Sequence, residues 1–145
     1  RDTLSVIVRK TKKINVSQIA ESYRKICKEI NGYIDNLKMQ GKTVAIWGAS
    51  HQGFTLASTA HLEEKISYII DSAPFKQGKY APASHIPIVS PAYAVNNPVD
   101  AIIIMAPGYT EEIASIIYEK FGKNIEIAVM MAKDLQMYED IKKCQ

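Results

Sequence analysis

One short stretch, 43–53, constrains the fold of this chain more than any other. Its first half, Thr43–Trp47, is β-branched, small or aromatic and carries no charge, which is typical of a strand buried on both faces of a parallel sheet. Gly48 ends this run, and Gly53 opens a helical pattern of apolar residues. A strand, a turn bounded by glycines and a helix start have the shape of a phosphate-binding turn, because free N–H groups and the helix dipole face whatever lies above Gly48.

The spacing of this turn resembles a dinucleotide-binding fingerprint with one departure. It reads Gly48-x-Ser50-x-x-Gly53, so serine replaces the middle glycine that lets a pyrophosphate approach the backbone, which weakens the case for NAD. Gln52 stands where a nucleophile elbow needs glycine, so that motif is absent. Asp71 ends the next apolar run, where a carboxylate can accept hydrogen bonds from a ribose diol. The alternative is a turn that only packs helix on strand, with no ligand.

Strands and helices alternate along the rest of the chain. Strands are predicted at 65–71, 85–89, 100–107 and 125–131, and helices at 18–40, 53–64, from Ser90-Pro91, at 110–122 and at 133–143. This order predicts an α/β fold: a Rossmann-like, doubly wound, mainly parallel five-stranded sheet preceded by a long N-terminal helix. Thr43–Trp47 is expected at the centre of the sheet, and Pro87 places its own strand at an edge.

The long helix and the residues before it bear on domain organisation. Thr3–Arg9 alternates like a strand but has no nearby hairpin partner, so residues 1–14 are interpreted as the end of a preceding domain or a linker, and 15–145 as the domain itself. Because the chain starts at Arg1, we expect it to be a piece of a longer protein. Asn15 is the expected cap of the helix, whose apolar stripe can pack across the sheet or bridge to a preceding domain.

Composition excludes several classes of function. The chain has 145 residues, enough for one domain with a core, and 47% hydrophobic against 23% charged residues, which is ordinary for a globular protein. A net charge of +3, with lysines spread along the chain, does not favour nucleic acid. No apolar run reaches membrane length, and no His, Cys, Asp or Glu set has metal-ligand spacing. Two distant cysteines, Cys27 and Cys144, indicate a reducing cytoplasm.

Three blocks of sequence together resemble a known family. The blocks 47–53, 69–78 and 85–91 match the pattern Gly-Ala-x-x-x-Gly, then Asp-x-x-Pro-x-Lys-Gln-Gly, then His-Ile-Pro-Ile-x-x-Pro, in order and at compatible spacing. This pattern is similar to that of the C-terminal domain of sugar C-methyltransferases. The middle block is the most specific, and the resemblance covers about Asn15 to Met131. The opening Thr3-Leu-Ser-Val resembles the last strand of the methyltransferase domain that precedes this one in the family.

The resemblance implies a division of labour within a methyltransferase. Members of the family use S-adenosylmethionine to methylate a carbon of a nucleotide-linked deoxy keto-sugar. An upstream domain of the same chain would bind S-adenosylmethionine and carry the catalytic base. The present domain would cover the active-site cleft and help hold the sugar nucleotide, without catalysing the reaction by itself.

Candidate substrate-binding residues follow the carboxyl ends of three predicted strands, where a doubly wound sheet opens its crevice. They are Gly48, Ala49, Ser50, His51, Gln52, Gly53, Asp71, Lys76, Lys79, Tyr80 and Tyr109. Ser50, His51 and Gln52 can reach a phosphate or a sugar hydroxyl from the helix start. Lys76 and Lys79 can neutralise a diphosphate, or can be solvated loop lysines.

Other side chains near these segments have more than one interpretation. Asp71 can bind a hydroxyl, or it can cap the turn at 72–75. Phe75 is expected in the core, and His85 is expected to fix its loop. We therefore expect a pocket between 48–53, 71–80 and 107–109.

Two other functions stay open at this point. The chain can be an independent domain that binds NAD or another nucleotide, although Ser50 counts against that. It can also be a Rossmann-like interaction module without a ligand, for which the apolar stripe of the long helix is the best support.

Overall fold

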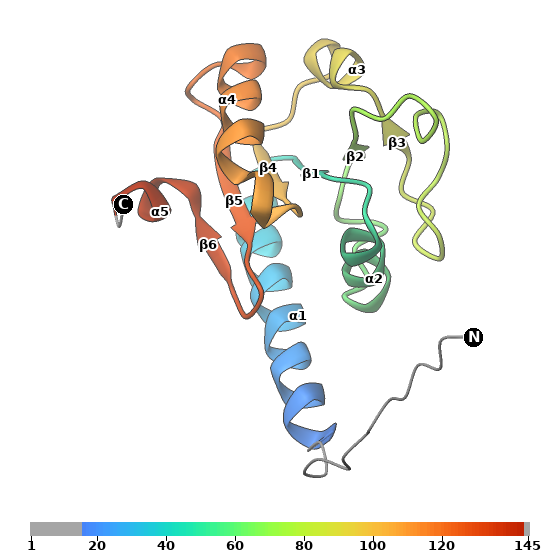
Figure 1. Cartoon of the computed structure of the whole chain (residues 1–145), viewed down its shortest axis with the longest axis vertical. Helices are drawn as coiled ribbons and strands as arrows, with labels where there is room; N and C mark the ends of the chain where they lie inside the picture. The colour runs from blue at the N-terminus through green and yellow to red at the C-terminus, as the bar shows by residue number, and fades with distance from the viewer. Residues whose placement is uncertain (1–15, 144–145) are drawn as a thin grey trace, which may run out of the picture.

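The computed structural model describes residues 16–143 of the chain. The predicted strand Thr3–Arg9, the domain boundary before residue 15 and the Asn15 cap lie outside the described residues. The elements in chain order are α1 (Val16–Met39), β1 (Val44–Trp47), α2 (His51–Thr59), β2 (Ile69–Ile70), β3 (Ile88–Val89), α3 (Pro91–Asn96), β4 (Ala101–Ile104), the 3-10 turn η1 (Pro107–Tyr109), α4 (Thr110–Phe121), β5 (Glu126–Met130), β6 (Leu135–Met137) and α5 (Tyr138–Lys143) (Figure 1).

The strands form one sheet in the order β3-β2-β1-β4-β5-β6, with β1 between β2 and β4. All pairs are parallel except β5 with β6. The predicted fold class, the central position of β1 and the edge position of β3 are confirmed. The edge of β3 is not left open, because the Gly78 N–H donates to Ile88 O over 2.9 Å and the Ile88 N–H to Lys79 O over 2.7 Å.

The predicted number of five strands is wrong, because the structure has a sixth, β6. A turn closed by the Met131 N–H on Asp134 O, at 2.9 Å, returns the chain along β5, where Val129 pairs with Gln136. The helix predicted at 133–143 therefore begins only at Tyr138. The second strand and the helix before it are also shorter than predicted, at Ile69–Ile70 and His51–Thr59.

Helices cover both faces of the sheet. Successive side chains along each strand point to opposite faces, so they pack into two separate hydrophobic cores, one on each face. Ile46 and Ile103 point to the face covered by α1 and α2, where they pack with Leu56. Trp47 and Ile104 point to the face covered by α3, α4 and α5. All four residues of β1 are buried, as its uncharged sequence predicts.

The ends of the helices follow their sequence signals. Ser90 caps α3 by accepting a hydrogen bond from the Tyr93 N–H, with Pro91 at the first position, as predicted. Gly41 and Gly122 follow α1 and α4 with φ of +73° and +84°, a backbone conformation that favours glycine. Among residues 16–143, no helix combines the length and the apolar character needed to cross a bilayer.

Candidate functional site

The turn after β1 is built from two glycines and a serine cap. Gly48 adopts φ +116°, and its N–H donates to Ile70 O at 2.8 Å, which ties the turn to β2. Ser50 Oγ accepts a hydrogen bond from the Gly53 N–H at 3.2 Å and caps α2. A Cβ on Gly53 would lie only 2.8 Å from Gly48 O, so the close approach of helix and strand excludes a side chain there. Each glycine of the motif is therefore required by the backbone.

Asp71 holds this turn from the end of β2. The residue is 8% exposed, and its Oδ2 accepts a hydrogen bond from the Ala49 N–H at 2.8 Å. Its Oδ1 accepts one from the Ala73 N–H at 2.9 Å, which is the capping of the following turn that the sequence left as an alternative. Asp71 therefore has a structural role, and its predicted contact with a substrate hydroxyl is a separate matter that stays a proposal.

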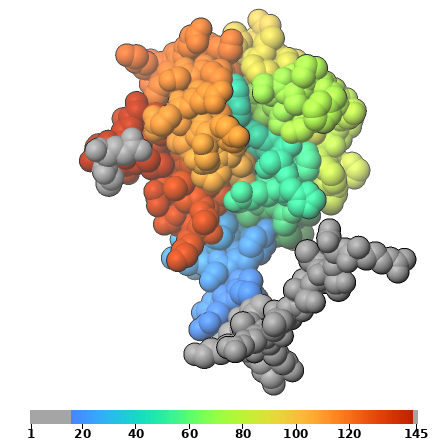
Figure 2. Space-filling model, viewed as in Figure 1, coloured from blue at the N-terminus to red at the C-terminus, as the bar shows by residue number. Residues whose placement is uncertain are grey.

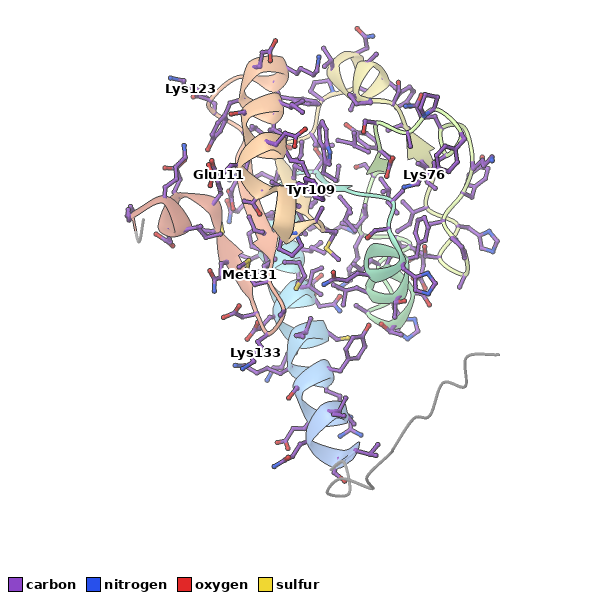
Figure 3. All side chains as sticks on the ribbon, in the orientation of Figure 1. Lys76, Tyr109, Glu111, Lys123, Met131 and Lys133 are labelled. Carbon is purple, nitrogen blue, oxygen red and sulfur yellow. The ribbon has the colours of Figure 1, made fainter. Side chains whose placement is uncertain are left out.

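Lys76 completes the arrangement. Its ammonium lies 3.0 Å from Asp71 Oδ2 and donates a hydrogen bond to Ala49 O over 2.9 Å (Figure 3). Both backbone polar groups of Ala49 are thus bound, its N–H by the carboxylate and its carbonyl by the ammonium. We call these three residues the Asp71–Lys76 clamp. Sequence reasoning placed Asp71 and Lys76 in the site but missed their contact with each other.

The remaining predicted residues lie closer to solvent. Lys79 is exposed, and within residues 16–143 its ammonium makes no hydrogen bond or ion pair. His51 and Gln52 are exposed at the start of α2, and Tyr80 and Tyr109 are each 66% exposed. Lys79 is therefore the lysine of this loop whose charge stays available to a ligand.

The prediction that Phe75 lies in the core is wrong, because its side chain is 70% exposed. The loop from Ser72 to Lys79 closes on itself through backbone hydrogen bonds, including the Lys76 N–H to Ala73 O at 3.1 Å, and so stays on the surface. The ring has the Lys76 ammonium 5.8 Å from its centroid, within the range of a cation–π contact.

The three predicted segments follow β1, β2 and β4, but they line different hollows. His51 and Gln52 border a hollow of about 390 Å³ together with Met130 and Met131. Pro107–Tyr109 border one of about 370 Å³, which also includes Met131. Met131, at the carboxyl end of β5, therefore links two of the segments (Figure 3). Sequence reasoning missed Met131, although its place after a buried parallel strand was the available signal.

The third hollow lies beside β3 and is lined with aromatic rings. It measures about 390 Å³ and is bordered by Lys79 and Tyr80, and by Tyr68 and Tyr93, whose rings meet edge to face at a centroid distance of 5.9 Å. The Tyr68 hydroxyl donates to Asn97 O at 2.5 Å, and burial raises the pKa of Tyr68 to about 12. The phenol is therefore neutral and positioned at any ordinary pH.

The described residues do not fit S-adenosylmethionine or NAD in the usual manner of a Rossmann turn. Such cofactors place a ribose diol on the carboxylate that follows the second strand. Here Asp71 already accepts from two backbone N–H groups and from the Lys76 ammonium, which leaves about one of its four acceptor positions, too few for both hydroxyls of a ribose diol. Among residues 16–143, no cluster of three His, Cys, Asp or Glu side chains has the geometry to hold a metal ion.

Comparison with solved structures gives two likenesses at low scores. The chain is similar to UDP-D-quinovosamine 4-dehydrogenase from Vibrio fischeri, with 17% identity, a TM-score of 0.45, and coverage of 71% of this chain and 84% of that one. It is also similar to RSP, a Rex-family repressor, with 14% identity, a TM-score of 0.47, and coverage of 90% and 74%. At these scores neither likeness carries an argument about ligand or function.

Comparison of sequences is more informative. The chain is 32% identical over 97 residues to the C-methyltransferase NovU of Streptomyces niveus, a match that covers 66% of this chain and 23% of that protein. The chain therefore spans less than a quarter of the length of this relative. Residues 9–130 match the family described as the C-methyltransferase C-terminal domain, which includes the turn, the clamp and the sheet from β1 to β5. The chain belongs to the C-methyltransferase C-terminal domain family.

Proposed function

We propose that this domain binds a nucleotide-linked keto-sugar for an S-adenosylmethionine-dependent C-methyltransferase. The observation that carries the proposal is the start of α2. The first backbone hydrogen bond of the helix runs from the Phe54 N–H to Ser50 O, and the Gly53 N–H donates to Ser50 Oγ. The N–H groups of His51 and Gln52 come before these two in the chain, in the first turn of the helix, where an N–H has no carbonyl partner within the helix. These N–H groups and the helix dipole favour an anion above the turn.

A diphosphate is the anion that suits this place in the proposed enzyme. The Asp71–Lys76 clamp fixes both polar groups of Ala49, so the turn needs no rearrangement when a ligand binds. Lys79 and Tyr80 line the separate hollow beside β3, where the lysine would offer a cation to another part of the same substrate and the ring a surface against which a base or sugar can pack. Tyr109 would line the cleft from the neighbouring segment after β4.

The chemistry of methyl transfer is assigned to an upstream domain of the intact, cytoplasmic protein. S-adenosylmethionine supplies the methyl group when it is bound there, and a base in that domain removes the proton beside the keto group of the sugar. The residues of the present domain bind the substrate and orient it. They take no part in the proton transfer, and the domain alone is expected to be inactive.

The test is steady-state kinetics of the protein that carries the upstream domain, with a nucleotide-linked keto-sugar. Lys79→Ala removes one charge-assisted contact at an exposed position, so KM should rise about three- to tenfold while kcat changes little. Lys123→Ala is the matched control, because Lys123 is exposed and precedes β5, at the opposite end of the sheet (Figure 3). An unchanged KM for Lys79→Ala would show that this lysine does not contact the substrate.

One observation favours a second candidate, a turn without a ligand. The 2.8 Å approach of a Cβ on Gly53 to Gly48 O explains that glycine by packing alone. A thermal-shift measurement on this chain with thymidine diphosphate, NAD and S-adenosylmethionine separates the possibilities. Stabilisation by thymidine diphosphate alone supports the proposal, and stabilisation by NAD supports an independent nucleotide-binding domain. No stabilisation supports the interaction module or a cleft that is complete only with the upstream domain, and the kinetic test above separates these two.

A further inference from the structure

The apolar stripe of α1 continues beyond the part of the helix that the sheet covers. Ile30, Ile34 and Leu37 are fully buried in the core, where they pack under the sheet. The same stripe runs on toward the N-terminus at steps of three and four residues, through Ile26, Tyr23, Ile19 and Val16. Exposure rises along it, to 59% at Ile19 and 71% at Val16. The apolar face of α1 therefore passes from fully buried residues, through the part-buried Ile26 and Tyr23, to the exposed Ile19 and Val16.

The part of this stripe before Ile30 forms one wall of a groove. The groove measures about 750 Å³ and runs between α1 and the turn from β5 to β6. Its walls include Val16, Ile19, Tyr23, Ile26, Ala132 and Lys133, and we call it the α1 groove. This part of the helix projects from the body of the domain (Figures 1 and 2). A helix end without a packed face is only marginally stable in water, so an occupant of the groove would stabilise this end of α1.

The α1 groove is continuous with the candidate site. Tyr23, Ile26 and Ala132 line both the groove and the hollow that His51 and Gln52 border. A protein domain bound in the groove would therefore also border the start of α2. It would supply the wall that this open hollow lacks.

We propose that the α1 groove docks the upstream domain of its own polypeptide, an inference that rests on the proposed function. Two observations favour this occupant over a second copy of the chain. The match covers only 23% of the C-methyltransferase NovU, so a related polypeptide continues well beyond this domain. The polypeptide also enters α1 at Val16, on the groove itself, so an upstream domain is held there at high effective concentration, whereas a second copy has no tether.

Docking predicts a change in the exchange of backbone amides along α1. In this chain, amides from residue 16 to residue 22 belong to the exposed end of the helix, before Tyr23 packs on the core, and should exchange quickly. In the protein that carries the upstream domain, their exchange should be at least tenfold slower. Ile19→Glu places a charge in the groove and should abolish this slowing.

A matched control separates docking from a general effect of charge. Lys28→Gln lowers the net charge by the same single unit as Ile19→Glu. Lys28 lies nine residues further along α1, which places it on the opposite side of the helix, and it is exposed. The slowing should persist in this variant. Because no ligand is present in the measurement, the result does not depend on whether Lys79 and the start of α2 hold a substrate.

The other outcomes overturn the proposal. Equal exchange in the short chain and the longer protein would show that nothing upstream covers the groove. Slowing in the short chain that grows with its concentration, together with a dimer in sedimentation that Ile19→Glu dissociates, would assign the groove to a second copy. Slowing in the longer protein that survives Ile19→Glu would place the upstream domain elsewhere.

Discussion

Removing the Lys76 ammonium should destabilise the domain more than its surface position suggests. In Lys76→Ala, Asp71 loses its ion-pair partner and Ala49 O loses its donor. A hydrogen bond to a charged group contributes about 1.5–3 kcal/mol, and the lysine side chain is 30% exposed, which reduces both contributions. We therefore expect the free energy of unfolding to fall by about 2 kcal/mol. Asp71 keeps its two backbone donors, so the turn should still form.

Asp71→Ala should cost more than Lys76→Ala. It strips the acceptor from the buried Ala49 N–H and from the Ala73 N–H, and it leaves Lys76 without its anion. Breaking a buried pair from one side costs about 3–5 kcal/mol, and the lower end applies because the carboxylate is 11% exposed. In the variant that carries both changes, the free energy of unfolding should fall by about 1 kcal/mol less than the sum of the two single effects, because the residues contact each other.

The assay is equilibrium unfolding in urea, followed by the fluorescence of Trp47. This is the single tryptophan of the chain, is 5% exposed, and immediately precedes the turn that the clamp holds. Lys79→Ala is the matched control, since this exposed lysine lies on the same loop, and its effect should stay within about 0.5 kcal/mol. If Lys76→Ala costs no more than Lys79→Ala, or if the two clamp variants add without coupling, the clamp does not stabilise the turn.

Three further predictions concern single residues. Gly53→Ala should destabilise the domain by about 1 kcal/mol or more in the same urea assay, because the new Cβ meets Gly48 O, and this outweighs the better helix propensity of alanine. Gly32→Ala is the control: Gly32 has open space around it, so this change should stabilise the domain by about 0.5–1 kcal/mol. Ser50→Ala should remove the α2 cap and cost about 1 kcal/mol, and a thermal melt that matches the parent chain would refute the cap. The pKa of Tyr68 is raised from the ordinary value near 10 to about 12, so the folded state binds the phenol proton more tightly than the unfolded state does. The stabilisation that comes from this shift should be complete below pH 10 and be lost as the pH rises toward 12. Absorbance of tyrosinate against pH, compared with Tyr68→Phe, tests this, and a transition near pH 10 would contradict it.

The sequence by itself determined the frame of the domain. Thr43–Trp47 could be recognised as a central strand because an uncharged run bounded by Gly48 fits only a position covered on both faces. Pro87 places its strand at the edge because proline removes a donor from the ladder. The serine caps of α2 and α3 are local signals of a few residues, and α3 formed where its signal predicted. Features set by neighbours in the chain were therefore predictable.

Features that depend on distant partners were decided only by the tertiary structure. Strand β6 is three residues long, with Gln136 between two apolar residues, and it exists because β5 offers it a pairing edge. Phe75 looked like a core residue, but a loop closed on its own backbone kept it in solvent.

The same distinction holds for the candidate site. Sequence position placed Asp71 and Lys76 in one loop after β2, but Ala49, the residue that both of them bind, comes from another strand end. The contact becomes possible only because parallel pairing brings the carboxyl ends of β1 and β2 side by side. A pattern along the chain can say which residues reach this edge of the sheet, but only the fold decides which of their charges neutralise one another and which, like that of Lys79, stay available.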